Sequence, residues 1–166
     1  ARFRERALGL ASTVDEVDAP AAIPAAVARY LKANTLPLAA VCWPELKVLD
    51  WRSSGIEIAV RAARDADLVG ITGAFCAIAE TGTLVVLAGA DTPTATTLLP
   101  DTHVAVLRAE RIVSGMEEAF ALIRRERGRL PRAVNMISGA SRTGDIEQTI
   151  VLGAHGPFRV HILVLG

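Results

Sequence analysis

The feature that most constrains the fold of this chain is the alternation of short apolar runs with helix-like stretches. The runs are rich in Val, Ile and Leu and end at Gly, Pro or Asp, which is typical of buried strands. The expected strands are Leu38–Trp43, Ile56–Val60, Leu68–Thr72, Thr83–Leu87, His103–Leu107, Ala133–Ile137 and Arg159–Leu165, and the expected helices are Ile23–Ala33, Ala74–Glu80, Ser114–Arg127 and Gly144–Leu152. Strands that are apolar throughout suit a sheet covered on both faces. The pattern predicts a three-layer α/β/α fold with a mostly parallel, mixed sheet.

The domain organisation follows from length and local composition. A chain of 166 residues suits one domain, and 51% hydrophobic residues can fill its core. Residues 23–166 are expected to form this domain. Residues 1–22 are interpreted as a helical arm followed by a Pro/Ala-rich linker. Because the chain begins with Ala1 inside a helix-like stretch, we expect the arm to be incomplete.

Charge and cysteine content exclude several classes of function. Lys plus Arg equals Asp plus Glu, so no nucleic-acid partner is expected, and the basic stretch Arg124–Arg129 is interpreted as complementing a helix dipole. No apolar run is long enough for a membrane span. Cys42 and Cys76 have no CxxC spacing and are interpreted as buried thiols of a reducing compartment, which predicts a cytoplasmic protein. No residues have metal-ligand spacing, so no metal is expected.

The segment Ser138–Glu147 is the first candidate site. It is expected to join a strand to a helix, and the backbone N–H groups at a helix start favour an anion. Arg142 could hold a carboxylate through two parallel hydrogen bonds. The alternative is local: a hydroxyl side chain caps the helix and the acids complement its dipole. The candidate substrate-binding residues of this segment are Ser138, Gly139, Ser141, Arg142 and Thr143.

Glu80 and two histidines are the other candidates. Glu80 ends an apolar run, where a carboxylate is costly to bury unless it is paired, so it is a candidate acid, base or nucleophile. Alternatively, Glu80 only holds the turn. His155 lies between two glycines and could shuttle a proton. His103 opens a strand and could reach the same rim, although a structural role is open too. The turn residues Thr81, Gly82 and Thr83 complete the predicted substrate-binding set.

Three segments carry a resemblance to a known family: Gly70–Val86 with its Glu-Thr-Gly-Thr turn, Leu98–Leu107, and Ile137–Glu147 continued by Gly153–Pro157. In order and separation they resemble the signature blocks of the lactate-utilisation (LUD) domain family. The resemblance implies a fold similar to sugar-phosphate isomerases and CoA transferases. It also implies a part in the oxidation of L-lactate to pyruvate, beside iron–sulfur partner subunits. A small carboxylate is the ligand expected at Ser138–Glu147.

The cysteine count decides which subunit the resemblance implies. An iron–sulfur cluster generally needs four thiolates, and this chain has two cysteines, so it would be the cluster-free subunit with no cofactor of its own. Assembly with further copies of itself is also open. Two other functions remain: a non-catalytic assembly or sensing subunit of the same system, and an enzyme of the CoA-transferase or isomerase type with Glu80 as nucleophile.

Overall fold

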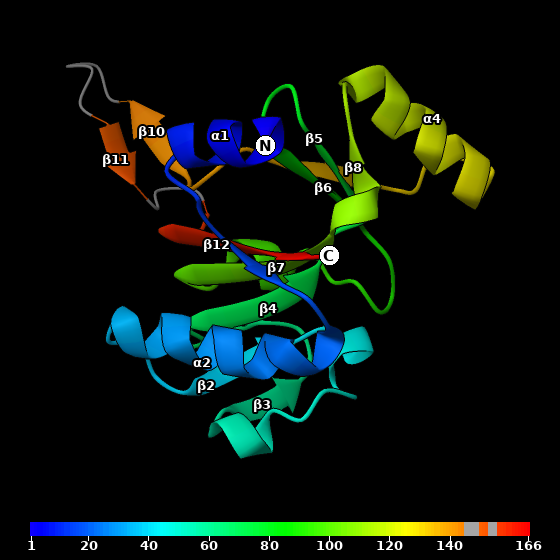
Figure 1. Cartoon of the computed structure of the whole chain (residues 1–166). Helices are drawn as coiled ribbons and strands as arrows, with labels where there is room; N and C mark the ends of the chain where they lie inside the picture. Colours follow the sequence, from blue (N-terminus) through cyan, green and yellow to red (C-terminus); the bar gives the residue numbers. More distant parts are fainter. Residues whose placement is uncertain (145–149, 153–155) are drawn as a thin grey trace.

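A parallel sheet of six strands forms the centre of the molecule. The computed structural model describes residues 1–144, 150–152 and 156–166. The sheet has the order β1-β12-β7-β4-β2-β3, and every pair in it is parallel (Figure 1). Its strands are β1 (Thr13–Val17), β2 (Ala39–Cys42), β3 (Glu57–Val60), β4 (Val69–Gly73), β7 (Thr102–Arg108) and β12 (Arg159–Leu165). The predicted α/β fold is therefore confirmed.

A second sheet of four strands lies on one side of the first. Its order is β8-β5-β6-β9, and it is mostly antiparallel. Its strands are β5 (Cys76–Ile78), β6 (Thr83–Leu87), β8 (Ile112–Val113) and β9 (Val134–Ile137). A separate antiparallel pair consists of β10 (Arg142–Gly144) and β11 (Ile150–Leu152). The sequence pattern did not predict this second sheet.

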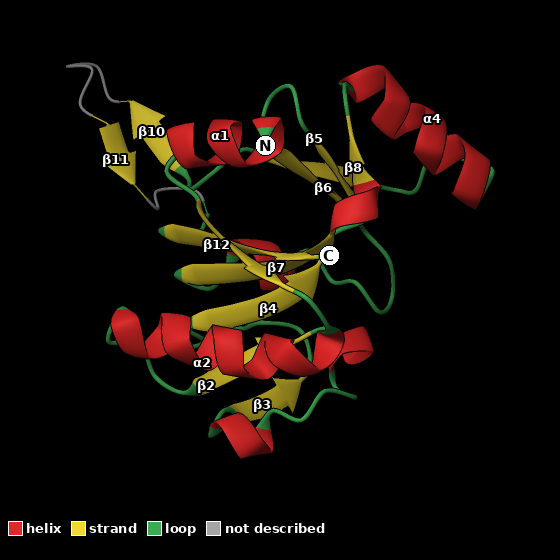
Figure 2. Ribbon diagram, viewed as in Figure 1, coloured by secondary structure: helices red, strands yellow, loops and turns green. Residues whose placement is uncertain are grey.

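Helices lie on both faces of the six-stranded sheet and on the far face of the second sheet, as Figure 2 shows. They are α1 (Arg2–Gly9), α2 (Ile23–Ala33), α3 (Ala95–Leu98) and α4 (Met116–Arg127), with 3-10 turns at η1 (Pro20–Ala22), η2 (Pro44–Leu46), η3 (Arg52–Ser54) and η4 (Ala109–Arg111). None of the helices in the described residues has the length and apolar character that a bilayer span requires.

Side chains alternate between the two faces of the six-stranded sheet, as a strand requires. Val104 and Val106 pack with α2 residues such as Val27 and Leu31. The opposite face carries a separate cluster, in which Ala105 and Leu107 meet α1 and the second sheet; its other members include Phe3, Ala7, Ala77 and Leu84. The far face of the second sheet packs against α4. The core therefore has one layer more than the sequence predicted.

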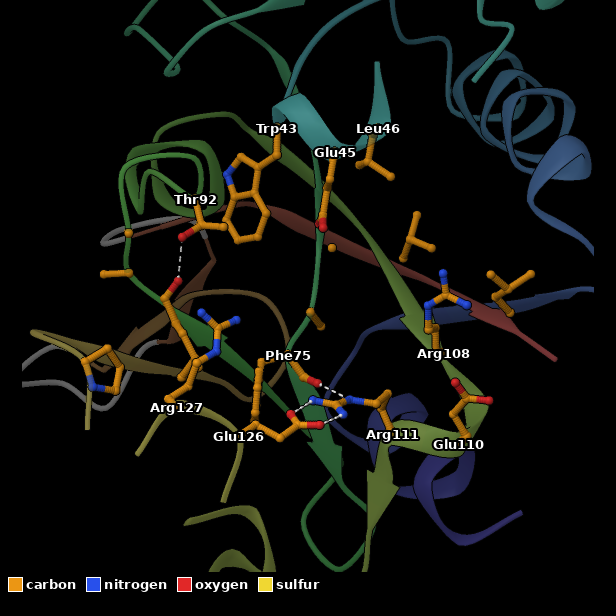
Figure 3. Close-up of a pocket in the computed structure, with 18 of the residues that line it drawn as sticks. Trp43, Glu45, Leu46, Phe75, Thr92, Arg108, Glu110, Arg111, Glu126 and Arg127 are labelled. Carbon is orange, nitrogen blue, oxygen red and sulfur yellow. Dashed lines mark hydrogen bonds and ion pairs between the residues drawn. The ribbon is translucent and has the colours of Figure 1, made fainter. Parts of the chain in front are cut away.

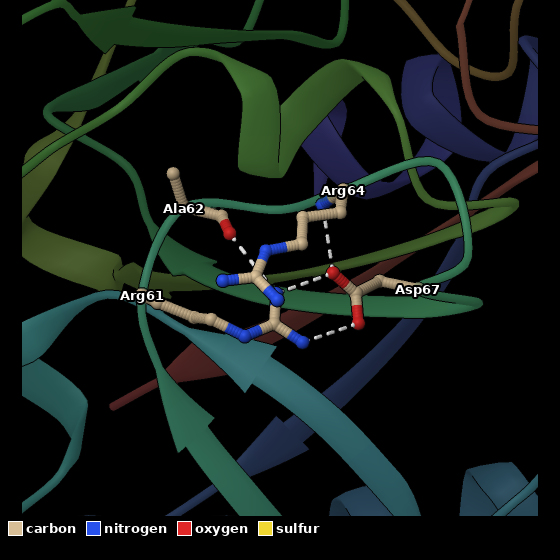
Figure 4. A network of polar contacts seen from close by, with 4 residues as sticks. All are labelled: Arg61, Ala62, Arg64 and Asp67. Carbon is tan, nitrogen blue, oxygen red and sulfur yellow. Dashed lines mark hydrogen bonds and ion pairs between the residues drawn. The ribbon is translucent and has the colours of Figure 1, made fainter.

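An ion pair fixes the crossover between β3 and β4. The Arg61 guanidinium donates two hydrogen bonds to the Asp67 carboxylate, at 2.6 and 2.9 Å, and the Arg64 backbone N–H donates a third at 2.7 Å (Figure 4). Hydrogen bonding from Arg61 holds the pKa of Asp67 below its ordinary value. This loop brings β4 to the side of β2 opposite β3.

Three sequence expectations about local structure are wrong. The expected linker after the arm is strand β1, whose Thr13 pairs with His161 of β12. The expected helix Ala74–Glu80 is strand β5 with its flanking turns. The expected helix Gly144–Leu152 is a strand at both described ends, because β10 and β11 pair there; residues 145–149 lie outside the described residues.

Helix α4 forms where the sequence predicted it, but with a different cap. Ser114 and Glu117 have the sequence spacing of a capping box. Gly115 is the N-cap instead, with no side-chain cap hydrogen bond, and the Ser114 N–H donates to the carboxylate of Glu118 at 3.0 Å. Gly128 ends the helix in the left-handed conformation.

Two glycines with left-handed backbones allow a matched test of how tightly α1 is packed. A Cβ at Gly139 (φ +79°) would meet the backbone oxygen of Leu10, whereas one at Gly128 (φ +74°) would meet nothing within 4 Å. We expect Gly139→Ala to lower the free energy of unfolding by roughly 2–4 kcal/mol and Gly128→Ala by about 1 kcal/mol, the cost of backbone strain alone. Urea denaturation measures both. Equal losses of unfolding free energy in the two variants would show that α1 moves aside for the new methyl group at no energetic cost.

Candidate functional site

Three predicted site residues meet at one end of the second sheet. The Thr81 hydroxyl lies 2.8 Å from that of Thr83, which lies 2.7 Å from the hydroxyl of Ser138, 55 residues further along the chain. The pairing of β6 with β9 places them there, because Leu84 is opposite Ile137 and the next residues outward are Thr83 and Ser138. Thr81 and Ser138 are exposed. We call these three residues the hydroxyl cluster.

The glycines beside the hydroxyl cluster have a structural reason. Gly82 (φ +73°) and Gly139 both adopt the left-handed conformation, and both face α1 or the residue after it. A Cβ at Gly82 would lie 2.6 Å from the backbone nitrogen of Ala7. Close approach of α1 therefore requires glycine at both positions, which accounts for them without a ligand.

The rest of the predicted loop, Ser141–Thr143, follows the hydroxyl cluster in the sequence. The Ser141 backbone N–H donates to the carbonyl of Pro157 at 3.0 Å, so the Gly-Pro segment that follows His155 adjoins the Ser138 loop. His155 itself lies outside the described residues. Arg142 and Thr143 belong to β10, opposite Leu152 and Val151. The predicted helix start, and with it the expected dipole at Ser138–Glu147, is absent from Arg142–Gly144.

Glu80 does not occupy the environment that the sequence suggested. It is exposed, so the expected burial cost does not arise. Its carboxylate lies close to Gly115, the N-cap of α4, where a Cβ would be 3.4 Å from Oε2. A helix N-terminus favours a negative charge there. This placement fits the structural alternative, in which Glu80 supports the turn, and leaves its catalytic role a prediction.

His103 is not part of the hydroxyl-cluster surface. It is fully buried near the amino end of β7, and its Nε2 lies 2.7 Å from the hydroxyl of Thr72. The expectation that His103 reaches a ligand-binding rim therefore fails for the described conformation. Its partner strand residue Gly70 is covered in turn by α3, because a Cβ there would meet the backbone oxygen of Thr96 at 2.5 Å.

A large pocket, which the sequence did not predict, lies at the carboxyl ends of β2, β4, β7 and β12. Its volume is about 860 Å³, and its walls include Trp43, Glu45, Gly73, Arg108 and Leu165 at or just after those strand ends (Figure 3). Ligands of open parallel sheets bind at this edge. We call it the carboxyl-edge pocket.

The hydrogen bonds of Arg111 hold together one wall of the carboxyl-edge pocket. Arg111 donates two hydrogen bonds to the Glu126 carboxylate, at 2.6 and 2.7 Å, and one to the Phe75 carbonyl at 2.8 Å (Figure 3). Its guanidinium also lies 4.6 Å from the centre of the Phe75 ring. These bonds tie η4 and α4 to the segment that follows β4, so Arg111 is fully engaged within the protein.

The family model of the LUD domain matches residues 27–165. This chain belongs to the LUD domain family. It is 30% identical to lactate utilization protein C of Bacillus licheniformis over 128 residues and 34% identical to that of Bacillus subtilis, in both cases over 74% of this chain and 53% of the relative. The chain thus spans about half the length of these curated relatives.

A solved structure resembles the whole LUD domain described above. The crystal structure of a DUF162 family protein from Deinococcus radiodurans matches with a TM-score of 0.70 at 26% identity. The match covers 99% of this chain and 94% of the other. The six-stranded parallel sheet and its companion sheet are therefore an arrangement that a solved protein shares.

The two cysteines of this LUD domain lie in separate parts of the core. Cys42 packs in the cluster under α2, and Cys76 in the cluster under α4. Burial raises the pKa of each thiol to about 11. Both are therefore neutral thiols, which are poor nucleophiles and poor metal ligands. Within the described part of the chain, no three His, Cys, Asp or Glu side chains are grouped to hold a metal ion.

The sequence signals of the LUD domain were stronger for the hydroxyl cluster than for the pocket. The Glu-Thr-Gly-Thr and Ser138 segments stand out as polar breaks between apolar runs. Arg127 and Arg129, by contrast, were interpreted only as charges at a helix end. Glu45 lies 28 residues before Gly73, which it contacts. No local pattern links these residues, because the sheet brings them together.

Because two histidines are buried, we expect the folded protein to lose stability in acid. Burial lowers the pKa of both His103 and His161 to about 4, against an ordinary value of 6.5. Between these values the unfolded chain takes up protons that the folded chain does not. Stability therefore falls as the pH drops from about 6.5 to about 4 and then levels off for these groups.

Urea denaturation at pH 7 and pH 5 measures this effect. We expect His103→Gln and His161→Gln each to reduce the stability lost between the two pH values by roughly 2 kcal/mol. Carboxylate titration is common to all three proteins and cancels in the comparison. Identical losses in wild type and variants would contradict the assignment.

Proposed function

We propose that this LUD domain works in lactate utilisation, as the cluster-free component of a multi-subunit system that oxidises L-lactate to pyruvate. Its family membership and its relatives named lactate utilization protein C support this proposal. With two buried cysteines in these 166 residues, iron–sulfur clusters would be carried by partner subunits.

We further propose that a small carboxylate binds at the hydroxyl cluster. The observation that carries this is the hydrogen-bonded chain Thr81–Thr83–Ser138, which joins two of the signature segments at an exposed surface. Hydroxyl groups can donate to a carboxylate and to the 2-hydroxyl of a hydroxy acid. Arg142, four residues after Ser138, would supply the positive charge.

Titration calorimetry with L-lactate and pyruvate tests the binding step. We expect Ser138→Ala and Arg142→Ala to weaken binding about tenfold or more, since each removes a hydrogen bond to a charged group. Arg132→Ala, which changes an exposed arginine just before β9, is the matched control and should bind as the wild type does. If Arg142→Ala and Ser138→Ala bind unchanged, the carboxylate lies elsewhere.

Two other variants, Glu80→Gln and His155→Ala, assayed with the iron–sulfur partner proteins and an artificial electron acceptor, separate the two roles within this system. A part in the chemistry predicts that Glu80→Gln or His155→Ala slows lactate-dependent reduction while lactate binding persists. If both variants turn over at the wild-type rate, the chain is an assembly or sensing subunit instead. A covalent acyl adduct on Glu80 would point to the CoA-transferase type of enzyme.

A further inference from the structure

The carboxyl-edge pocket lies where the crossovers of the parallel sheet change sides. The β2–β3 connection packs on the α2 side, where Leu46 and Trp51 join the cluster of Val27. The connection that leaves β4 packs on the opposite side, where Ala77 meets Ala105. Because the chain leaves two adjacent strands toward opposite faces, a crevice opens between their carboxyl ends. Trp43 and Gly73, the residues at these two ends, both line it.

This pocket is larger than a small acid would fill. A volume of about 860 Å³ lies in the range of roughly 300–1,000 Å³ that is typical of drug-sized ligands. A three-carbon hydroxy acid would leave most of that space to water. The pocket therefore fits a second, larger ligand, independent of the carboxylate proposed at the hydroxyl cluster.

The charges that remain in the pocket favour an anionic ligand. Arg111 and Glu126 neutralise each other, and the remaining lining charges are three arginines against the two carboxylates of Glu45 and Glu110, which leaves one net positive charge. Among the residues that the structure describes, Arg108, Arg127 and Arg129 form no ion pair although all three line the pocket. Arg108 ends β7, whereas Arg127 and Arg129 come from the end of α4 and the residues after it. Guanidinium groups on two walls suit a phosphate or diphosphate.

Glu45 indicates which kind of anionic ligand suits the pocket. Its carboxylate contacts Gly73 at the end of β4, in the space that a side chain there would fill (Figure 3). A carboxylate repels a simple anion but accepts hydrogen bonds from hydroxyl groups. An acidic residue at a strand end performs this role for the ribose of nucleotides in other parallel sheets. The pocket thus combines an acceptor for a diol with donors for a phosphate.

Exposed apolar side chains in the pocket offer a surface that a flat ring of the ligand could cover. Val48, on the segment after β2, is 81% exposed, and Leu130, just after α4, is 47% exposed. Both line the pocket, from different walls. Apolar side chains that are exposed in this way gain from covering a flat ring, because contact removes their surface from water.

We propose that the carboxyl-edge pocket binds a ribonucleotide phosphate. The phosphates lie against Arg108, Arg127 and Arg129, the ribose hydroxyls donate to Glu45, and the base lies against Val48 and Leu130. A sugar phosphate shares the first two contacts but not the third.

Titration calorimetry on the whole chain tests this with ADP, ribose 5-phosphate and inorganic phosphate as probes. ADP should bind most tightly. Arg108→Ala and Arg127→Ala should each weaken ADP about tenfold, whereas Arg124→Ala, on the same helix but outside the pocket, should not. Glu45→Gln should weaken ADP and ribose 5-phosphate but not inorganic phosphate. Circular dichroism and thermal unfolding verify that each variant is folded.

Several results would overturn the proposal. No ADP binding at millimolar concentration would do so, as would equal affinity for ADP and inorganic phosphate. Ribose 5-phosphate binding as tightly as ADP would replace the nucleotide with a sugar phosphate. ADP binding that is lost in Ser138→Ala and unaffected by Arg127→Ala would place the anion at the hydroxyl cluster. Because lactate is not among the probes, failure here leaves the proposed function standing, and the reverse also holds.

Discussion

The packing of the small sheet onto the parallel sheet is the contact on which the rest of the structure depends. It is made by small and aliphatic side chains, with Ala77 and Leu84 on one side and Ala105 and Leu107 on the other. Short side chains let the two sheets approach closely, and the packed face leaves the small sheet no freedom to slide. The position of β6 is therefore fixed along its whole length.

Both candidate sites follow from the position of β6. Thr83, its first residue, belongs to the hydroxyl cluster, and Leu87, its last, lines the carboxyl-edge pocket. Four residue steps of extended strand separate these ends by roughly 13 Å. The two sites are thus distinct but mechanically joined through one buried strand. A carboxylate at one end and a nucleotide at the other would thus contact the same buried strand.

The sequence located five of the six strands of the parallel sheet, because they are apolar runs with clear boundaries, and it missed β1, which it assigned to a linker. It failed at Cys76–Ile78, where three buried residues between turns can be read as helix or strand. Pairing with β6 and β8 decides in favour of the strand. At Arg142–Gly144 the glycine and polar residues resembled a helix start, whereas pairing with β11 makes a strand.

The sequence likewise predicted some residues of the candidate sites correctly and missed others. Thr81, Thr83 and Ser138 were predicted and do meet, because they flank strands that the sequence located approximately. His103 was predicted at a rim and is buried, because β7 is an interior strand of the parallel sheet, between β12 and β4. The carboxyl-edge pocket could not be predicted, because Glu45, Arg108 and Arg127 come from separate elements that only the crossovers bring together. Burial and pairing partners, unlike periodicity, are not local properties of the sequence.

Backbone amide chemical shifts of the labelled protein test most directly the claim that the two ends of β6 carry separate sites. Addition of L-lactate should shift the amides of Thr81, Gly82 and Gly139 and leave those of Phe75, Gly89 and Leu130 unchanged. Addition of ADP should produce the opposite pattern. If both ligands shift the same amides, or if L-lactate shifts none around Gly139, the account of two sites on one strand is contradicted.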